Sequence, residues 1–284
     1  MSDLITYLVS GVALGCTFAL IGSGYVVIHR VTRVVNFAQG TFAVFGGFIS
    51  YSLLDGTLPQ GLAQLVTVVA CGLIGLIVGL VAIGKPGTDP LIALIVTLGV
   101  SIFCAAVFIT AWGQDPISPP GLRGSVSILG ADVQRQRLLV VAATLLTFVA
   151  LSLFFSRTYA GKGLTACASN PRAAALVGIN VRRMGFMAFA VGGALGGLAG
   201  ALISPSVALS FSSDLPFALS GFAAAVFGGL TSPGRTLLGG IVLGVTGQLV
   251  AGYLDGSFQT EVALLMMLAI MVVRSRTYVT EEAK

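Results

Sequence analysis

Charged side chains are scarce in this sequence. Lysine, arginine, aspartate and glutamate together make up 9 % of the 284 residues, whereas soluble domains carry about 25 %. Hydrophobic residues make up 56 %, and the 15 basic residues are spread between apolar runs instead of forming a block. This excludes an ordinary soluble domain and gives no basis for nucleic-acid binding. The composition predicts an all-α, polytopic integral membrane protein in contact with membrane lipid, which we treat as a single domain over residues 1–284.

Side chains that carry catalysis or bind metals are equally scarce. The single histidine, His29, lies beside Arg30 at the end of an apolar run, and the cysteines are isolated, with no CxxC spacing. No charged residue occupies the middle of an apolar run, although the ion relays of secondary transporters usually need one there. We therefore expect no catalytic residue, no metal site and no cofactor bound by this chain. An Na⁺ site built from backbone carbonyls at a broken helix stays open.

Long apolar runs dominate the chain instead. A helix needs about 20 apolar residues to cross a bilayer, and most of the runs approach or exceed that length. Two of them are short, so we expect a bundle of about nine transmembrane helices, within a range of eight to ten. The runs cover residues 4–28, 34–54, 62–83, 91–112, 138–155, 184–203, 217–230, 237–254 and 258–273.

The basic residues predict how these helices are oriented. If the N-terminus is outside and every run crosses, only Arg123, Arg135 and Arg137 lie outside, and the other lysines and arginines lie in the cytoplasm. Cytoplasmic loops carry such an excess of positive charge. We therefore expect an external N-terminus and a cytoplasmic C-terminus. The three external arginines belong to the proline-containing segment 113–137, where they either bind an external partner or are solvated loop charges.

Glycines recur at four-residue spacing in several runs. In lipid, such small residues let helix backbones approach closely, so we expect close packing inside the bundle, with a dimer face as the alternative. The pairs include Gly11 with Gly15, Gly75 with Gly79, Gly193 with Gly197, and Gly240 with Gly244. The pentapeptide AVFGG occurs at residues 43–47 and 225–229, in runs of opposite expected direction. An inverted repeat gives this arrangement.

Residues 157–183 form a polar, basic interlude between two apolar runs. Asn170 followed by Pro171 is typical of a helix N-cap with proline at the first helical position. Gly178 can adopt the left-handed conformation that closes a helix, so the pattern predicts a short helix over residues 171–177, too short to be stable alone. It is either a docking element for a soluble protein or part of an ordinary charged loop. The basic residues of this interlude include Lys162, Arg172, Arg182 and Arg183.

The polar feature inside an apolar run is the pair Asn36 and Gln39. Their spacing places both amides on one helix face near its cytoplasmic end, and Gly40 loosens the helix beside them. Buried amides need hydrogen-bond partners. They therefore either hold helices together or line a polar path.

Three segments, spread from residue 11 to residue 245, together resemble the permease family of branched-chain amino acid ABC transporters, the Liv-type importers. The most specific is GKGLTACASNPRAAALVGINVRRMGFMAFAVGGALGGLAGAL, which is similar to the family's cytoplasmic coupling loop and the helix after it. The others are GVALGCTFALIGSGYVVIHRVTRVVNFAQGTFAVFGG, similar to the opening helix and its Asn-Phe-Ala-His-Gly stretch, and GFAAAVFGGLTSPGRTLLGGIVLGV.

This chain departs from the family pattern at two positions. Arg172, Ala173, Ala174 and Gly178 occupy the places of the Glu-Ala-Ala and glycine pattern by which importer permeases engage their ATPase, but Arg172 replaces the glutamate. A specific acidic contact to the ATPase is therefore not expected, although the helix is. Gln39 stands where the family more often has histidine, which leaves the substrate path open.

The resemblance implies a permease subunit of an ATP-binding cassette importer in a bacterial or archaeal cytoplasmic (inner) membrane. It would translocate branched-chain or related amino acids together with a second, related permease in a heterodimer. Two cytoplasmic ATPase subunits would bind ATP and Mg²⁺, and a periplasmic or lipid-anchored binding protein would deliver the substrate. ATPase coupling would fall to Asn170, Pro171, Arg172, Ala173, Ala174 and Gly178, and the substrate pathway would include Asn36, Phe37, Gln39 and Gly40.

Two alternatives stay open from the residues. A permease of the same type would carry urea or short amides. A stand-alone channel or ion-coupled carrier for a small polar solute would leave segment 157–183 with a purely topological role.

Overall fold

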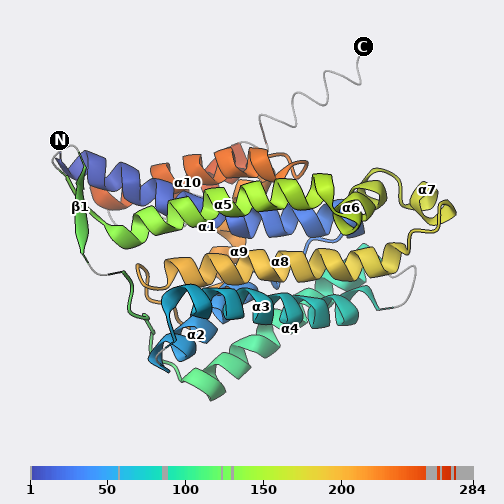
Figure 1. Cartoon of the computed structure of the whole chain (residues 1–284), viewed down its shortest axis with the longest axis horizontal. Helices are drawn as coiled ribbons and strands as arrows, with labels where there is room; N and C mark the ends of the chain where they lie inside the picture. Colours follow the sequence, from blue (N-terminus) through green and yellow to red (C-terminus); the bar gives the residue numbers. More distant parts are fainter. Residues whose placement is uncertain are drawn as a thin grey trace, which may run out of the picture.

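The computed structural model describes residues 2–56, 58–84, 89–122, 124–128, 131–253, 261–262, 264–269 and 272. Within these residues the chain forms a helical bundle with one small hairpin (Figure 1). The elements are α1 (Ser2–Thr32), α2 (Gln39–Asp55), α3 (Gln60–Ile83), α4 (Pro90–Trp112), β1 (Ser125–Ile128), β2 (Ala131–Gln134), α5 (Arg135–Arg157), α6 (Tyr159–Ser169), α7 (Pro171–Leu176), α8 (Val181–Ile203), α9 (Asp214–Phe227) and α10 (Pro233–Tyr253).

Six helices of the described chain are long and apolar enough to cross a membrane, namely α1, α3, α4, α5, α8 and α10. The α2 and α9 helices are shorter, with 17 and 14 residues, where a span needs about 20. Of the ninth predicted run, 258–273, the structure describes residues 261–262, 264–269 and 272, which are helical. The all-α, polytopic membrane fold is thus confirmed, whereas the count of about nine helices is not.

The long helices lie side by side along the length of the molecule (Figure 1). The N-terminus and the β1–β2 hairpin lie at one end, which we call the hairpin end. The α6 and α7 helices lie at the other, which we call the α7 end. The short helices α2 and α9 run in opposite directions: α2 leads toward the hairpin end, where Trp112 Nε1 donates to Ser52 Oγ at 2.8 Å, and α9 leads toward the α7 end. The first AVFGG copy lies in α2, and the second begins in α9 and continues two residues past its end. The inverted repeat stays a prediction.

Glycine contacts hold the centre of the bundle together. A Cβ on Gly15 of α1 would lie 2.5 Å from the carbonyl oxygen of Gly240 in α10, and a Cβ on Gly193 of α8 would lie 2.9 Å from Cα of Gly75 in α3. Side chains larger than hydrogen do not fit at these crossings. The glycine pairs seen in the sequence therefore serve packing within this chain, as expected for helices in lipid.

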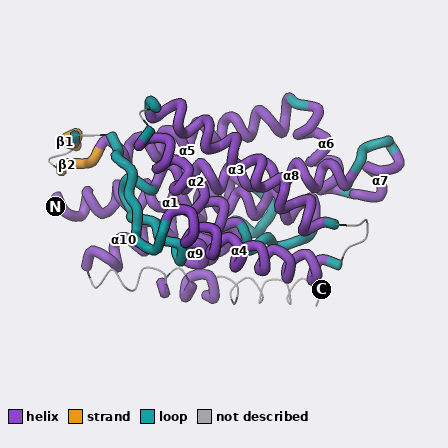
Figure 2. Tube along the Cα trace, turned by 90° about the horizontal axis from the view of Figure 1, so that it is seen from below, coloured by secondary structure: helices purple, strands orange, loops and turns teal. Residues whose placement is uncertain are grey.

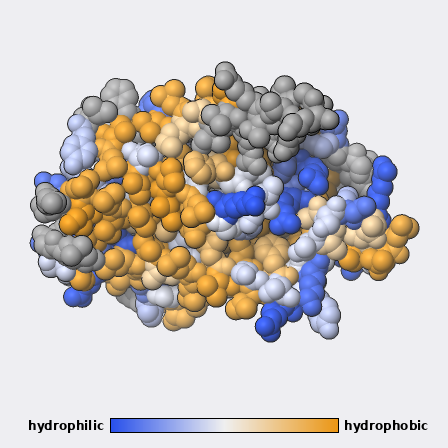
Figure 3. Space-filling model, turned by 90° about the horizontal axis from the view of Figure 1, so that it is seen from above, coloured by the Kyte–Doolittle hydropathy of each residue, from blue (hydrophilic) through white to orange (hydrophobic). Residues whose placement is uncertain are grey.

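The outer faces of the bundle are apolar. Figure 3 shows a broad hydrophobic area on the face that carries α5 and α10. On α5, Leu146 is 71 % exposed, and on α4 Ile102 is 74 % exposed. Such surface is costly in water and suits contact with lipid tails or another apolar helix.

The segment between α4 and α5 contains a hairpin that the sequence analysis did not predict. The β1 and β2 strands pair antiparallel, with Val126 opposite Val133. Before the hairpin, the segment runs beside the loop between α8 and α9, where Ile117 and Leu209 exchange backbone hydrogen bonds of 2.8 and 2.9 Å. Figure 2 shows these loops gathered at the hairpin end, away from α7. The prolines of segment 113–137 argue against a helix, and its described residues up to Gln134 contain none, whereas Arg135 to Arg137 already belong to α5.

Candidate functional site

The α6 helix packs the α7 end of the chain against the bundle. Thr158 caps α6, its Oγ1 accepting from Gly161 N at 3.0 Å. A Cβ on Gly161 would lie 2.2 Å from the carbonyl oxygen of Phe154, so this position requires glycine. Leu164 and Cys167 are buried in a cluster that also contains residues of α1, α7 and α8. A displacement of α6 would therefore press directly on these helices.

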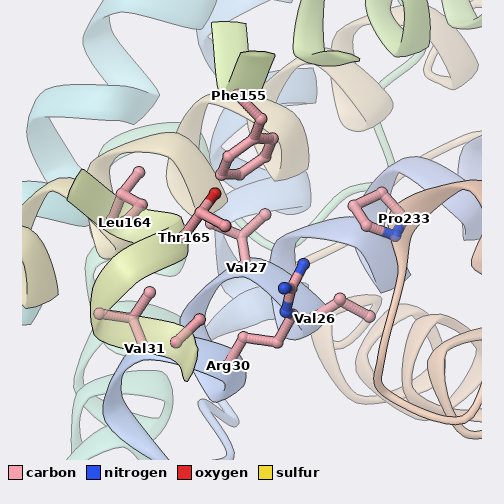
Figure 4. A pocket seen from close by; sticks show the side chains of 9 residues that line it. Val26, Val27, Arg30, Val31, Phe155, Leu164, Thr165 and Pro233 are labelled. Carbon is pink, nitrogen blue, oxygen red and sulfur yellow. The ribbon is translucent and has the colours of Figure 1, made fainter. Parts of the chain in front are cut away.

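Figure 4 shows where α6 meets the bundle in a small pocket at the α7 end. Side chains of α6 face the last turns of α1, and residues of α5 and the start of α10 line the other sides. The guanidinium of Arg30 points into the pocket. The labelled side chains are Val26, Val27, Arg30, Val31, Phe155, Leu164, Thr165 and Pro233.

The α7 helix has the caps that its sequence predicts. The Oδ1 atom of Asn170 accepts from the backbone N–H groups of Arg172 and Ala173, both at 3.1 Å. At the other end Gly178 has a φ of +86°, and its N–H donates to the carbonyl of Ala175 at 3.1 Å. The predicted helix over residues 171–177 is confirmed, with an end one residue earlier than expected.

The surface of α7 is almost fully exposed. Ala174 is buried beneath the helix, whereas Leu176 is 89 % exposed and the adjacent Val177 is 76 % exposed. Pro171, Arg172 and Ala173 are exposed as well. Figure 1 shows α7 at the tip of the molecule, beyond the ends of the long helices. Adjacent exposed apolar side chains on a capped projection are compatible with a docking element.

The basic residues around α7 do not form one cluster. Arg182 Nη2 donates to the carbonyl of Gly84 at 2.5 Å, and its guanidinium lies 5.3 Å from the ring centre of Phe186. Arg182 thus ties α8 to the end of α3. Lys162 and Arg183 instead line a groove of about 600 Å³ beside Gly178. This groove extends the exposed surface of α7.

The second candidate site differs from its predicted form. Asn36 lies in the turn before α2 and not on a helix face with Gln39, because the chain leaves α1 at Arg33, whose φ is +60°. Asn36 Oδ1 accepts from Ala38 N at 3.1 Å, and Phe37 N donates to Thr97 Oγ1 at 3.2 Å. The turn thus fastens the start of α2 against α4.

Both amides are fully buried, and each has one unpaired atom. Gln39 Nε2 donates to the carbonyl of Gly192 at 2.9 Å, which links α2 to α8. Among the described residues, Asn36 Nδ2 and Gln39 Oε1 have no hydrogen-bond partner. Gln39 therefore holds helices together, while Asn36 keeps a free donor inside the bundle.

A hydrogen-bond network of side chains next to these amides was not predicted from the sequence. Thr41 Oγ1 donates to Ser101 Oγ at 3.0 Å, and Ser101 Oγ donates to Asp214 Oδ2 at 2.7 Å. This network joins α2, α4 and the start of α9. A Cβ on Gly40 would lie 1.9 Å from the carbonyl oxygen of Asp214, so the first turns of α2 and α9 are in direct contact. No local signal marks this site, because its members come from three distant segments.

A bundle of membrane-length helices with buried polar links and a capped helix projecting from one end is the architecture of a membrane transport subunit. The chain belongs to the family of branched-chain amino acid transport system permease components, whose model matches residues 7–274. Permease components of ABC transporters work with ATPase and binding-protein partners. The predicted family resemblance is confirmed.

Individual relatives agree with this assignment over nearly their full length. The chain is 28 % identical to the high-affinity branched-chain amino acid transport system permease protein LivH of Salmonella typhimurium, covering 93 % of this chain and 91 % of that protein. It is also 28 % identical to BraD of Pseudomonas aeruginosa, covering 94 % and 92 %. The solved structure of PsaBC from Streptococcus pneumoniae in complex with Fab shares the fold, with a TM-score of 0.53 at 14 % identity over 95 % of this chain and 91 % of that chain.

Proposed function

We propose that this chain is the transmembrane permease subunit of an ATP-binding cassette importer for branched-chain or related amino acids. The family and the printed functions of LivH and BraD support this substrate class. The family also fits an importer better than a stand-alone channel or carrier. The hairpin end, with the N-terminus, faces the outside, and the α7 end faces the cytoplasm, as the distribution of basic residues suggests.

The observation that carries the proposal is the exposed surface of α7. A bilayer-embedded protein gains nothing from a rigid helix that presents Leu176 and Val177 to water unless a partner covers them. One of two cytoplasmic ATPase subunits receives α7 in a groove and binds ATP and Mg²⁺. This chain contributes the docking residues Asn170, Pro171, Arg172, Ala173, Ala174 and Gly178, and it binds no cofactor.

The contacts of α6 suggest how closure of the ATPases moves the permease. The buried Leu164 and Cys167 of α6 pack with Val27 and Val31 of α1, and Ala174 of α7 joins the same cluster. A push on α7 therefore moves α6 and the end of α1 together. Because packed helices resist internal deformation, we expect a rigid-body rocking of the bundle.

The opposite end meets the substrate-binding protein. Segments 113–137 and 204–216 are joined there by the Ile117–Leu209 bridge, so they form one surface. A second, related permease completes a heterodimer, and substrate passes along a path that includes the turn at Asn36, Phe37, Gln39 and Gly40.

Co-purification tests the docking role. The chain is purified gently from its native membrane, and the accompanying proteins are identified by mass spectrometry. We expect an ATPase with the wild type and at least a tenfold loss of it with Leu176→Glu, since a charge at the centre of an interface costs several kcal/mol. Leu122→Glu is the matched control, because Leu122 is also exposed, at the hairpin end, and it should retain the ATPase.

Retention of the ATPase by Leu176→Glu would contradict the role of α7. An absence of any ATPase from the wild type, under conditions that keep other membrane complexes intact, would contradict the importer itself and favour a channel or carrier. The binding protein found with the wild type is then screened against branched-chain amino acids, urea and short amides to identify the transported substrate.

A further inference from the structure

Two adjoining cavities open at the hairpin end of the bundle. The first has a volume of about 140 Å³ and lies among α1, α5, α10 and the loop after α8. The second has a volume of about 170 Å³ and lies between α1, α9 and the same loop. Leu14 and Val207 line both cavities, so the two are neighbours, and we call them the first and the second compartment.

The first compartment is rich in polar side chains. Ser10, Arg137, Ser206 and Gln248 line it, and among the described residues no carboxylate does. The guanidinium of Arg137 donates to Ser10 Oγ, while the Ser10 hydroxyl donates to the carbonyl of Thr6 at 2.5 Å. An arginine carries five N–H donors, so Arg137 keeps donors available toward the cavity.

The position of Arg137 makes its charge unfavourable unless an anion is present. It lies in the first turn of α5, close to Arg135, where the positive end of the helix dipole repels a cation. Its side chain is partly buried, where a charge without an anionic partner is costly. An anion bound to the guanidinium offsets the repulsion by Arg135, the repulsion by the helix dipole and the cost of burial.

The second compartment is largely apolar. Phe18 of α1 and Pro216 and Phe217 of α9 line it, with the hydroxyls of Ser213 and Ser220 at its wall. A ligand that fits both compartments has an anionic group at one end and a compact apolar group at the other.

We propose that Arg137 binds the carboxylate of the transported amino acid. The apolar side chain of that amino acid enters the second compartment, which Phe18 and Phe217 line. This inference rests on the proposed function and names the groups that would receive the cargo at the end facing the binding protein. Arg137 belongs to the disfavoured set of external arginines, and recognition of a carboxylate explains its presence there. A lipid phosphate offers the same anionic chemistry, so the experiment separates the two sources.

Thiol labelling of Ser206→Cys tests the site in the assembled transporter, reconstituted in liposomes of neutral lipid. Ser206 lines the cavity and is exposed, whereas all four natural cysteines are buried. We expect an anionic thiosulfonate to react several-fold faster than a cationic one. Leucine should slow the labelling and leucinamide, which lacks the carboxylate, should not.

Substitution of Arg137 completes the test. In the Ser206→Cys background, Arg137→Gln should abolish the preference for the anionic reagent and weaken protection by leucine roughly 10- to 100-fold, the loss expected for a charge-assisted hydrogen bond. Arg135→Gln is the matched control, because Arg135 lies in the same helical turn but does not line the cavity. If Arg137→Gln does not assemble, the comparison of leucine with leucinamide still decides, since it needs no change at Arg137.

Two results would overturn the inference. If phosphatidylglycerol added to the neutral liposomes protects the thiol from labelling and leucine does not, the site binds a lipid. Equal labelling by both reagents, with protection by neither leucine nor lipid, would make Arg137 a structural partner of Ser10. Either result obtained with a transporter that imports leucine refutes the inference alone, whereas a wild-type assembly that imports no amino acid refutes the proposed function.

Discussion

Gly178 illustrates how a single residue can set the shape of the docking element. Its φ of +86° lies in the left-handed region, and a Cβ there would meet nothing within 4 Å. The need for glycine is therefore conformational and not steric. A β-branched residue in this conformation costs more than the 1–2 kcal/mol estimated for ordinary residues.

We predict that Gly178→Val abolishes uptake while the protein remains in the membrane. The strained cap should shift the end of α7 and with it the exposed Leu176 and Val177. Uptake by reconstituted transporter and the amount of chain in the membrane fraction are measured together. Gly99→Val is the control, because Gly99 lies within a helix and also has open space around it. Normal uptake by Gly178→Val would remove the coupling role of this turn.

The two buried amides should respond differently to substitution. Gln39→Leu removes the 2.9 Å hydrogen bond to the Gly192 carbonyl, so we expect a loss of about 1 kcal/mol of stability, seen as a lower thermal unfolding temperature. Asn36→Leu removes the unpaired Nδ2 donor together with the 3.1 Å hydrogen bond that Oδ1 accepts from Ala38 N, so we expect a change in transport rate or selectivity in addition to a lower unfolding temperature. If Asn36→Leu lowers only the unfolding temperature, the amide holds the turn together and does not belong to the path.

Between helices, the crossing of α1 and α10 depends on glycines, which have no side-chain atoms that would keep the two backbones apart. Gly15→Ala would place a Cβ 2.5 Å from the Gly240 carbonyl oxygen, and the helices would have to separate. We expect a destabilisation of about 1–3 kcal/mol, as for other overpacked sites, measured by thermal unfolding in detergent. Gly61→Ala on α3 is the control, since nothing lies within 4 Å of its added methyl group. A Gly15→Ala protein as stable as the control would show that the crossing tolerates separation.

The elements also show which boundaries sequence patterns locate well. The α7 helix was predicted almost to the residue because its signals, Asn170, Pro171 and Gly178, act over one or two turns. The start of α2 was placed too early. Residues 34–38 are apolar enough to continue a helix, but Asn36 forms a turn with Ala38 and the segment is held by Thr97 of α4. A partner so distant in the sequence gives no local signal.

At the scale of the whole molecule, the importer and carrier mechanisms predict opposite energy dependence. We expect leucine uptake by the reconstituted complex to require ATP on the side of the ATPases and to be unchanged by an ionophore. The control is a complex whose permease carries Leu176→Glu, which should be inactive with ATP present. Uptake without ATP that collapses with the ionophore would identify an ion-coupled carrier, and uptake indifferent to both would identify a channel.

Composition, apolar runs and capping residues predicted a helical membrane protein with a short capped helix between two spans, because each of these signals comes from neighbouring positions. The family resemblance lies in three segments of the sequence, and the family model that matches residues 7–274 confirms it. The polar sites inside the bundle could not be predicted from the sequence. Arg137 meets Ser10 across 127 positions and Ser101 meets Asp214 across 113. Such contacts depend on how glycine-lined helices cross, and the free energy of that packing belongs to pairs of helices and not to any single stretch of sequence.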